Sequence, residues 1–532
     1  MSDSGIAVER HPEDPRARRQ KGKNMRLRLC VVAVLTVLGC GPSALAAVKL
    51  PAVFSDDMVL QRDRAVPVWG WADAGEKVTV TLNGRSESAT ADARGRWRVH
   101  LPAQPAGGPC EMTVAGTNTL SFRNVLLGDV WVCSGQSNME MGVGRCANPA
   151  AEIANSDHPK IRLFIVSRLL LGGEPREDCV GRWAVCGPKT VRDLSGVGYA
   201  FGRELHRTLG VPIGLIHACR GSTPITSWIS REALQTVPET APLLRRYDAI
   251  DAQLPELLAR YQKDVAAWNE AKAAGTPPNK LGPYPAEPGP EKDMYHPSGV
   301  YNGQVHPLMP FAIKGVIWYH GEADIGVAPL YARLFPLLIN DWRAHWGQGD
   351  FPFLFVQLAN FGDPRPQPGE SNFANLREAQ ALALSLPGTA MAVAIDAGAR
   401  DFFPTNKQPV ADRLALAARA VAYGEKIECS GPVFDRMQVE GAKAVISFQH
   451  VGGGLTIKGD ALAGFAVAGA DGKFVRADAI IEGDTVAVSS ALVPRPAAVR
   501  YAWADNPECN LYNRAGLPAA PFRTDRAVTS RP

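Results

Sequence analysis

The chain has 532 residues, of which 46% are apolar and 21% charged, and its formal net charge is +4. These values are typical of an ordinary soluble globular chain that is long enough for two or three domains. Basic residues gather into a cluster only near the N-terminus, so we expect no nucleic-acid partner.

The N-terminal segment predicts export. A basic cluster between positions 16 and 28 precedes the apolar stretch 29–38, and small residues follow at 44–46. This order is typical of a signal peptide, which predicts cleavage after Ala46 and a periplasmic or secreted protein. The apolar stretch of about ten residues is too short for a membrane span, which needs roughly 20. Lipid anchoring at Cys40 is the alternative, because the residues before it loosely resemble a bacterial lipoprotein motif.

Eight cysteines remain after such a cleavage, and an oxidising compartment permits disulfides among them. Cys179 and Cys186 are plausible partners across a short loop. Cys133 and Cys219 lie at the ends of apolar segments, where buried free thiols are an equally good interpretation. No Cys-x-x-Cys or His-x-x-x-His spacing indicates a metal site, so we expect neither a metal nor a cofactor.

Both ends of the chain predict small β-domains. Residues 48–124 and 425–528 contain short alternating segments separated by turn residues, which is typical of small β-sandwiches. The clearest segments are 66–71, 77–82 and 97–101 in the first region, and 444–448, 464–468 and 485–488 in the second.

Residues 125–424 show a different sequence pattern, in which apolar segments typical of buried strands alternate with longer helical segments. The predicted strands are 125–133, 212–218, 313–319, 351–358 and 390–395. The predicted helices are 199–209, 330–345, 375–386 and 407–423. This alternation predicts an α/β core with a parallel sheet covered on both faces and with functional groups at the carboxyl ends of its strands.

An insertion at about 231–300 interrupts this core. It contains a helical part around 254–273 and a proline-rich stretch at 276–290. A surface excursion and a lid that shapes a substrate cleft are equally good interpretations.

Ser137 is the strongest candidate for a nucleophile. It follows the apolar segment 125–132 in the sequence Cys-Ser-Gly-Gln-Ser-Asn-Met-Glu-Met at 133–141, where a strand turns into a helix. A serine hydroxyl at such a turn stands clear of the sheet, and the N–H groups of the next turn can stabilise an oxyanion. Residues 219–221 and 320–322 also follow predicted strands, so we expect the three segments to meet at one edge of the sheet.

These segments resemble the motifs of a known family. Gly-Gln-Ser-Asn-Met at 135–139, Trp-Tyr-His-Gly-Glu-Ala-Asp at 318–324 and Asp-Phe-Phe-Pro-Thr-Asn-Lys at 401–407 resemble the sialate O-acetylesterase family of the SGNH hydrolase superfamily. Further family-like segments extend the resemblance over nearly all of residues 48–526. The resemblance implies a three-layer α/β/α, flavodoxin-like core whose serine nucleophile removes acetyl groups from sugar hydroxyls.

Carried over by position, the resemblance implies a role for each residue around Ser137. Gly221 is expected to donate its N–H to the oxyanion together with the N–H of Ser137. Gln136, Asn138 and Arg220 are expected to contact the substrate. Because the family usually has a tryptophan at the position of Arg220, this residue is either a substrate-facing cation or a surface replacement.

The chain departs from the family at the next motif. His320 stands where the family usually has glutamine, although an imidazole can still donate one hydrogen bond to an oxyanion. Glu322 corresponds to a carboxylate that orients the catalytic histidine in related carbohydrate esterases. A buried ion pair or a loop cap is the structural alternative for Glu322.

The decisive departure is Phe403. The family segment has the form Asp-x-His-Pro-x-Asn-Lys, in which the histidine takes the proton of the serine, and Phe403 occupies the position of that histidine. The loss of a general base removes roughly 10²- to 10⁴-fold of rate. His320 or His217 could replace it, Asp401 or Glu322 could act as a direct carboxylate base, or a small activity could rest on the oxyanion hole alone.

Two hypotheses follow for the function. The first is a secreted carbohydrate O-acetylesterase that acts on acetylated sialic acid or acetylated polysaccharide through an acyl-enzyme with Ser137. The second is a catalytically impaired, glycan-binding relative that has lost its base at Phe403. The expected partner is an O-acetylated carbohydrate, and the sequence does not specify which sugar or which oligomeric state.

Overall fold

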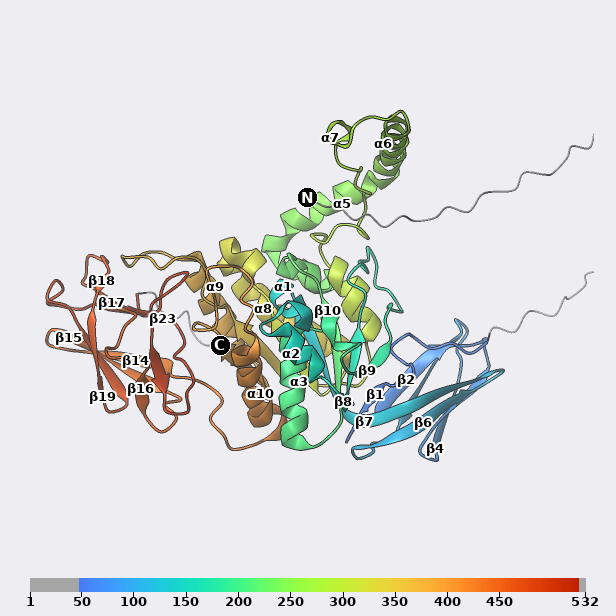
Figure 1. Cartoon of the computed structure of the whole chain (residues 1–532), viewed down its shortest axis with the longest axis horizontal. Coiled ribbons are helices and arrows are strands. Elements are labelled where there is room, and N and C mark those ends of the chain that lie inside the picture. Colours follow the sequence, from blue (N-terminus) through green and yellow to red (C-terminus); the bar gives the residue numbers. More distant parts are fainter. Residues whose placement is uncertain (1–46, 526–532) are drawn as a thin grey trace, which may run out of the picture. The chain divides into compact units, whose positions relative to one another are not determined.

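Strand β7 (Thr119–Gly135) takes part in two sheets at once. Its first half pairs antiparallel with β6 (Gly107–Ala115), and from Asp129 onward it pairs in parallel with two strands of the central sheet. Figure 1 shows β7 running from the N-terminal sheet toward the core. The boundary predicted between residues 124 and 125 therefore lies inside one continuous strand.

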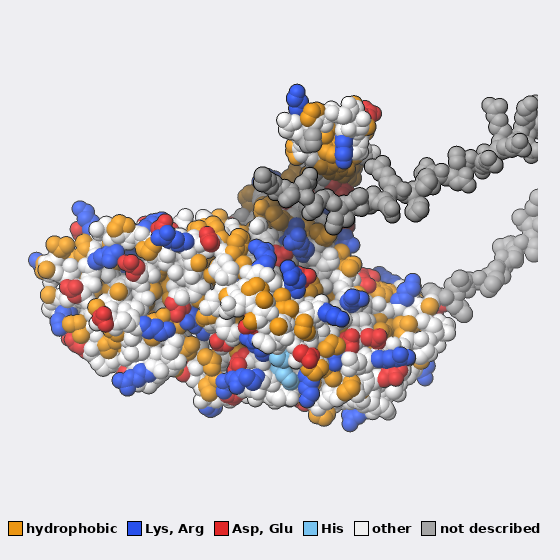
Figure 2. Space-filling model, viewed as in Figure 1, with side chains coloured by type: hydrophobic (Ala, Val, Ile, Leu, Met, Phe, Trp, Pro, Cys, Tyr) orange, Lys and Arg blue, Asp and Glu red, His pale blue; other side chains and the backbone are white. Residues whose placement is uncertain are grey.

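The computed structural model describes residues 47–525, which belong to one compact unit. The predicted signal peptide, its cleavage after Ala46 and the alternative anchor at Cys40 lie outside the described residues. Within residues 47–525, no helix is long and apolar enough to cross a membrane. On the face seen in Figure 2, basic and acidic side chains are intermixed.

The N-terminal region is all β, as predicted. Its other strands are β1 (Val59–Gln61), β2 (Val66–Trp71), β3 (Lys77–Leu82), β4 (Arg85–Thr90) and β5 (Arg96–Leu101). Strands β4, β3, β6 and β7 form one antiparallel sheet, β2 pairs with β5, and β1 pairs in parallel with β7. The β3–β4 turn has positive φ at Asn83 and Gly84, as a tight two-residue hairpin requires.

The central sheet has the strand order β13-β12-β11-β7-β10-β8-β9. Its strands besides β7 are β8 (His158–Ile165), β9 (Trp183–Cys186), β10 (Ile213–Cys219), β11 (Gly315–Tyr319), β12 (Phe353–Gln357) and β13 (Thr389–Val393). All neighbours are parallel except β8 and β9, so the five predicted core strands and their parallel pairing are confirmed.

Strands β8 and β9 are absent from the prediction. Strand β8 carries the buried Arg162, whose guanidinium donates to the carbonyl oxygens of Asp57 at 3.1 Å and Asn124 at 3.2 Å. A charged residue that is satisfied inside the fold interrupts the apolar pattern on which strand prediction rests.

The predicted core helices are also confirmed. They are α3 (Gly196–Leu209), α8 (Ala328–Trp346), α9 (Asn372–Ala381) and α10 (Gln408–Tyr423). Helices α3 and α10 pack against each other and against strands of the central sheet, and α8 packs against α9 (Figure 1). The molecule therefore has a mixed α/β core.

Further helices connect these elements. They are α1 (Ser137–Glu140), α2 (Pro149–Ala154), α4 (Arg231–Gln235), α5 (Ala241–Ala252), α6 (Leu254–Ala273) and α7 (Pro278–Leu281). The insertion supplies α4 to α7, and α6 has no buried residue over its 20 residues. Its Trp268 packs on Tyr284 of the returning chain, with ring centroids 5.1 Å apart, so this part of the insertion packs mainly on itself.

A buried carboxylate links the N-terminal region to the core. Asp129 of β7 accepts hydrogen bonds at 3.0 Å from Gln61 and Arg62 and from the hydroxyl of Tyr423 at the end of α10. The neighbouring guanidinium compensates the buried charge of Asp129, so the N-terminal strands, β7 and α10 are held together at one point.

The C-terminal region consists of small antiparallel sheets. Its strands are β14 (Val433–Glu440), β15 (Lys443–Gln449), β16 (Leu455–Ile457), β17 (Phe465–Ala468), β18 (Val475–Arg476), β19 (Asp478–Glu482), β20 (Thr485–Ser489), β21 (Ala498–Tyr501), β22 (Leu511–Asn513) and β23 (Phe522–Arg523). The fully buried Arg377 of α9 donates to the carbonyl oxygens of Ala504 at 2.7 Å and Asp505 at 2.9 Å. This contact fixes the C-terminal region to the core.

Candidate functional site

Ser137 is the first residue of α1, directly behind the end of β7. The turn depends on Gly135, because its φ of +132° favours glycine and a Cβ there would lie 2.2 Å from the carbonyl oxygen of Tyr319. The N–H of Gln136 donates to that same carbonyl at 3.0 Å. Strand β7 therefore turns sharply against β11 and leaves Ser137 partly exposed at the carboxyl edge of the sheet.

The structure brings Gly221 next to Ser137. Gly221 follows β10, which pairs with β7 so that Cys219 lies opposite Gly135. A Cβ on Gly221 would lie 3.4 Å from the Cβ of Ser137. The predicted meeting of the strand ends is confirmed, and a side chain at position 221 would fill the space beside the serine.

The carboxylate of Glu140 accepts the N–H of Gly221, which was predicted to stabilise an oxyanion. Its Oε2 accepts the N–H of Gly221 at 2.7 Å, and its Oε1 lies 3.3 Å from the guanidinium of Arg168. The N–H of Ser137, at the first position of α1, has no acceptor within the helix. The carboxylate thus sits where Gly221 would donate to a reacting oxygen.

Ser137 lines a cavity of about 660 Å³. Its lining residues are Ser137, Glu140, Met141, Gly142, Gly144, Arg145, Ile165, Val166, Ser167, Arg168, Leu169, Arg192, Asp193, His217, Cys219 and Phe403. None of them comes from the insertion at 231–300. Serine, histidine, charged groups and an aromatic ring thus face one space large enough for a small ligand.

Asn138 is buried and joins three segments of the chain. Its Nδ2 donates to Oε1 of Glu322 and, at 3.0 Å, to the carbonyl oxygen of Phe402. Its Oδ1 accepts a hydrogen bond from Nζ of Lys407 at 2.7 Å. The side chain that was expected to contact the substrate is engaged with the protein, and it fixes the orientation of α1.

Two ionisable groups beside Asn138 are perturbed by burial. Desolvation raises the pKa of Glu322, whose Oε2 is buried with no hydrogen-bond partner among residues 47–525. Desolvation also lowers the pKa of Lys407 to about 8. Glu322 and Lys407 are thus a buried acid and a buried base that share Asn138 as their common partner.

Phe402 and Phe403 are nearly half exposed, at 43% and 45%. Phe403 lines the cavity of Ser137. Phe402 stacks on Phe361, with ring centroids 3.8 Å apart, and lines a smaller neighbouring cavity together with Asp401 and Glu322. The two carboxylates considered as direct bases therefore do not line the cavity of Ser137.

His320 is fully buried behind the site. It stacks on Trp318, and its Nε2 lies 2.8 Å from the carbonyl oxygen of Thr223, so Nε2 carries the donated proton. Burial lowers the pKa of His320 to about 3. A role of its Nε2–H at an oxyanion would require the bond to Thr223 to break.

His217 lines the cavity of Ser137. Its Nδ1 accepts the N–H of Ser195 at 3.1 Å, which leaves the proton on Nε2 in the neutral ring. Burial lowers the pKa of His217 to about 4, so the ring is neutral at pH 7 and offers a hydrogen-bond donor rather than a base.

The remaining predicted residues lie at the edges of the site. Gln136 is buried, and Arg220, whose N–H donates to the carbonyl of Gly135 at 3.0 Å, is partly exposed. Neither lines the cavity of Ser137. Glu140 is a further site residue that was not predicted, although its position one helical turn after Ser137 is a signal that could have identified it.

The cysteines and metal-ligating side chains add no second centre within residues 47–525. All eight described cysteines are free thiols, so Cys179 and Cys186 do not pair. No group of three or more His, Cys, Asp or Glu side chains in this part of the chain could hold a metal ion.

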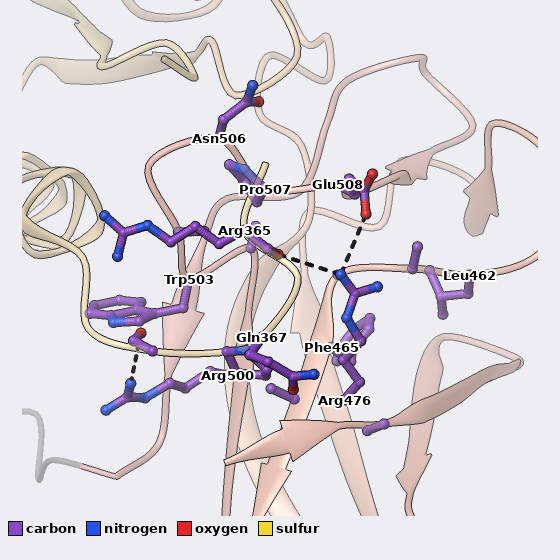
Figure 3. Close-up of a pocket in the computed structure, with 18 of the residues that line it drawn as sticks. Arg365, Gln367, Leu462, Phe465, Arg476, Arg500, Trp503, Asn506, Pro507 and Glu508 are labelled. Carbon is purple, nitrogen blue, oxygen red and sulfur yellow. Dashed lines mark hydrogen bonds and ion pairs between the residues drawn. The ribbon is translucent and has the colours of Figure 1, made fainter. Parts of the chain in front are cut away.

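Another cavity, of about 350 Å³, lies in the C-terminal region (Figure 3). Arg476 is paired there with Glu508 at 3.6 Å, and Arg500 donates to the carbonyl of Gly369 at 3.4 Å. The lining contains no serine, threonine, cysteine, histidine or lysine. The cavity of Ser137 therefore remains the candidate reaction site.

Comparisons with known proteins identify the family of the chain. The family model "Carbohydrate esterase, sialic acid-specific acetylesterase" matches residues 127–252 and 298–405, which include every predicted site residue. The human sialate O-acetylesterase is 32% identical over 455 residues, covering 78% of this chain and 79% of the human protein. The sialate O-acetylesterase of Rattus norvegicus is 36% identical over 425 residues, covering 72% and 75%.

A solved structure is also similar to this chain. The crystal structure of a carbohydrate acetylesterase from Xanthomonas citri superposes with a TM-score of 0.76 at 37% identity, covering 90% of this chain and 100% of that one. The chain belongs to the sialic acid-specific acetylesterase family of carbohydrate esterases.

Proposed function

We propose that this protein is a carbohydrate O-acetylesterase that uses Ser137 as its nucleophile. The observation that carries the proposal is the placement of Ser137 at the start of α1, beside Gly221 and facing a cavity. Attack of Oγ on an acetyl carbonyl gives an oxyanion, for which the N–H groups of Ser137 and Gly221 are suitable donors. Collapse releases the sugar hydroxyl, and water then hydrolyses the acetyl-enzyme.

The architecture and location that accompany this activity are part of the proposal. We infer a three-layer SGNH core over residues 125–424 with a β-domain on either side, at 48–124 and 425–528. We also infer export with cleavage after Ala46. The relationship to carbohydrate esterases supports the first inference, and the charge and apolar pattern before Ala46 supports the second.

The test is acetate release from p-nitrophenyl acetate and from acetylated sialic acid, xylan and xyloglucan. Ser137→Ala is expected to abolish the activity, whereas Ser167→Ala, which alters another serine of the same cavity, is the matched control. Equal rates for Ser137→Ala and the parent chain would remove Ser137 as the nucleophile.

A second candidate is a catalytically impaired, glycan-binding relative, and the observation that favours it is Phe403. An aromatic ring lines the cavity at the position where the family has its proton acceptor, and the carboxylates of Asp401 and Glu322 line a different cavity. In this case the cavity binds an acetylated sugar, and the parent chain releases no acetate from any of the four substrates.

A further inference from the structure

The sheet of β2 and β5 presents an aromatic and basic face. Trp69 and Trp71 are two positions apart on β2, so their indoles lie on the same face of the strand. In the antiparallel register they lie opposite Arg98 and Arg96 of β5. Two indoles and two guanidinium groups thus form one patch.

The exposure of these two indoles is unusual among the tryptophans of the chain. Eight of its 11 tryptophans are buried, and only Trp69, Trp71 and Trp268 are partly exposed. Trp268 packs on Tyr284 within the insertion. Trp69 makes an edge contact with Phe54 at 4.9 Å, and Trp71 donates its N–H to Glu177 at 3.2 Å. Both contacts hold the indoles in place and leave aromatic surface exposed.

Both indoles line a cavity of about 430 Å³, which is within the range of small-molecule sites. The other wall comes from a loop that contains Arg176 and Glu177, and from the short helix His306–Leu308. The cavity therefore combines aromatic surface with polar groups on the opposite side.

The charges at this cavity nearly balance. Arg96 pairs with Glu177, and Arg176 donates to Glu291 at 2.7 Å. Arg98 is exposed and forms no hydrogen bond or ion pair within residues 47–525. The cavity thus offers one free guanidinium donor beside aromatic surface, which suits a ligand with hydroxyl groups better than a strongly charged one.

Sugars have the matching chemistry. The C–H groups on one side of a pyranose ring carry a partial positive charge and pack against the electron-rich face of an indole. The ring hydroxyls accept hydrogen bonds from a guanidinium group such as that of Arg98.

One segment of the chain lines both cavities. Ser167, Arg168 and Leu169 face the cavity of Ser137, and Arg176 faces the cavity of Trp69. Because Arg176 lies seven positions after Leu169, the Cα atoms of these two wall residues are at most about 25 Å apart. A glycan of several sugar units can bridge such a distance.

We propose that the cavity of Trp69 and Trp71 is a distal carbohydrate subsite, which binds an extended glycan while one of its acetylated sugars lies at Ser137. The substrate class is then an acetylated polysaccharide or oligosaccharide rather than a free acetylated monosaccharide. The catalytic half of this statement rests on the proposed function, but the binding half does not.

The binding half is tested by electrophoresis of the full chain in native gels that contain acetylated xylan or acetylated xyloglucan. We expect at least one polymer to retard the parent chain and Trp69→Ala to abolish the retardation. Trp268→Ala, at a partly exposed tryptophan outside the cavity, is the matched control and should migrate like the parent chain. Arg98→Ala, at an exposed residue without partners, gives a second reading if Trp69→Ala fails to fold.

No retardation by either polymer, or unaltered retardation of both cavity variants, would overturn the subsite. For catalysis, Trp69→Ala and Arg98→Ala are expected to lower kcat/KM on the polymer, relative to p-nitrophenyl acetate, by roughly 3- to 10-fold. If the parent chain hydrolyses neither p-nitrophenyl acetate nor the acetylated polymer but is retarded by a polymer, the proposed function fails and the subsite stands. If it hydrolyses both and the ratio is unaltered in the variants, the subsite alone fails.

Discussion

Phe403 and Phe402 are neighbours with nearly equal exposure but different surroundings. The ring of Phe403 faces the cavity of Ser137, whereas Phe402 stacks on Phe361 and faces the smaller cavity. A histidine can therefore be placed at either position, and only the one at position 403 would face the cavity of Ser137.

We expect Phe403→His to raise the rate of p-nitrophenyl acetate hydrolysis by roughly 10²-fold or more, because an imidazole beside Ser137 can accept its proton. Phe402→His is the matched control and should have little effect. The measurement is kcat/KM against pH, in which the gained activity should increase near the pKa of a histidine, at about 6.5. No gain in Phe403→His would mean that another group is already the base or that the site is inert.

Glu140 places a negative charge where negative charge must develop during ester hydrolysis. Its bond to the N–H of Gly221 must break before a substrate oxygen can take that donor. A charged acceptor is bound more strongly than a neutral one, so we expect Glu140→Gln to raise kcat/KM for p-nitrophenyl acetate by about 10-fold.

The matched control for Glu140 is Glu440→Gln, at an exposed carboxylate of β14, which should leave the rate unchanged. A fall in the rate of Glu140→Gln would contradict this interpretation and would show that the carboxylate assists the reaction.

At the level of elements, the insertion contains a 20-residue helix, α6, none of whose residues is buried. The face of α6 that carries Trp268 is covered by its own returning chain, and no residue of 231–300 lines the cavity of Ser137. The family model also omits residues 253–297. These observations favour the surface excursion over the lid.

We therefore expect that replacing residues 255–288 by a short Gly/Ser linker preserves the fold and the activity. The ends are close in space, because Cδ1 of Leu254 lies 3.4 Å from the position of a Cβ on Gly289. Thermal unfolding should indicate a loss below about 1 kcal/mol, typical of changes away from the core. A lid role would instead appear as an altered KM on acetylated polymers.

The elements also show what the sequence can and cannot predict here. Long apolar runs and helical spacing predicted five core strands and four helices, because burial imposes those patterns. The strand-end rule predicted that Ser137, Gly221 and His320 would meet at one edge of the sheet. It could not predict that Asn138 and His320 form hydrogen bonds with the protein itself, because such partners come from distant segments, at Glu322, Lys407 and Thr223.

For the whole molecule, buried neutral histidines predict sensitivity to acid. Burial lowers the pKa of His217 to about 4 and that of His320 to about 3, and both are near 6.5 in an unfolded chain. The unfolded state therefore binds more protons between these values, so stability is retained above pH 6.5 and falls as the pH decreases. Each ring is expected to remove about 2 kcal/mol of stability between pH 8 and pH 5.

The measurement is the free energy of unfolding against pH for variants that keep the hydrogen bond but cannot titrate. His217→Asn retains an acceptor at the Nδ1 position, and His320→Gln retains a donor at the Nε2 position, so both should reduce the slope between pH 5 and 8. His100→Gln, at an exposed residue, is the control. Slopes equal to that of the parent chain would show that these rings do not govern the acid response.

Strand β7 has one further consequence for the whole molecule. The strand has a bulge at residues 123–124, but from Val125 to Gly135 it pairs without a further extra residue of its own, and Ser137 follows two residues later. Because strand side chains alternate between faces, adding or removing one residue would turn every later side chain of β7 to the opposite face. The pairing therefore fixes the number of residues between Val125 and Ser137. Homologues that keep this strand are expected to vary in sequence over this stretch but not in its length.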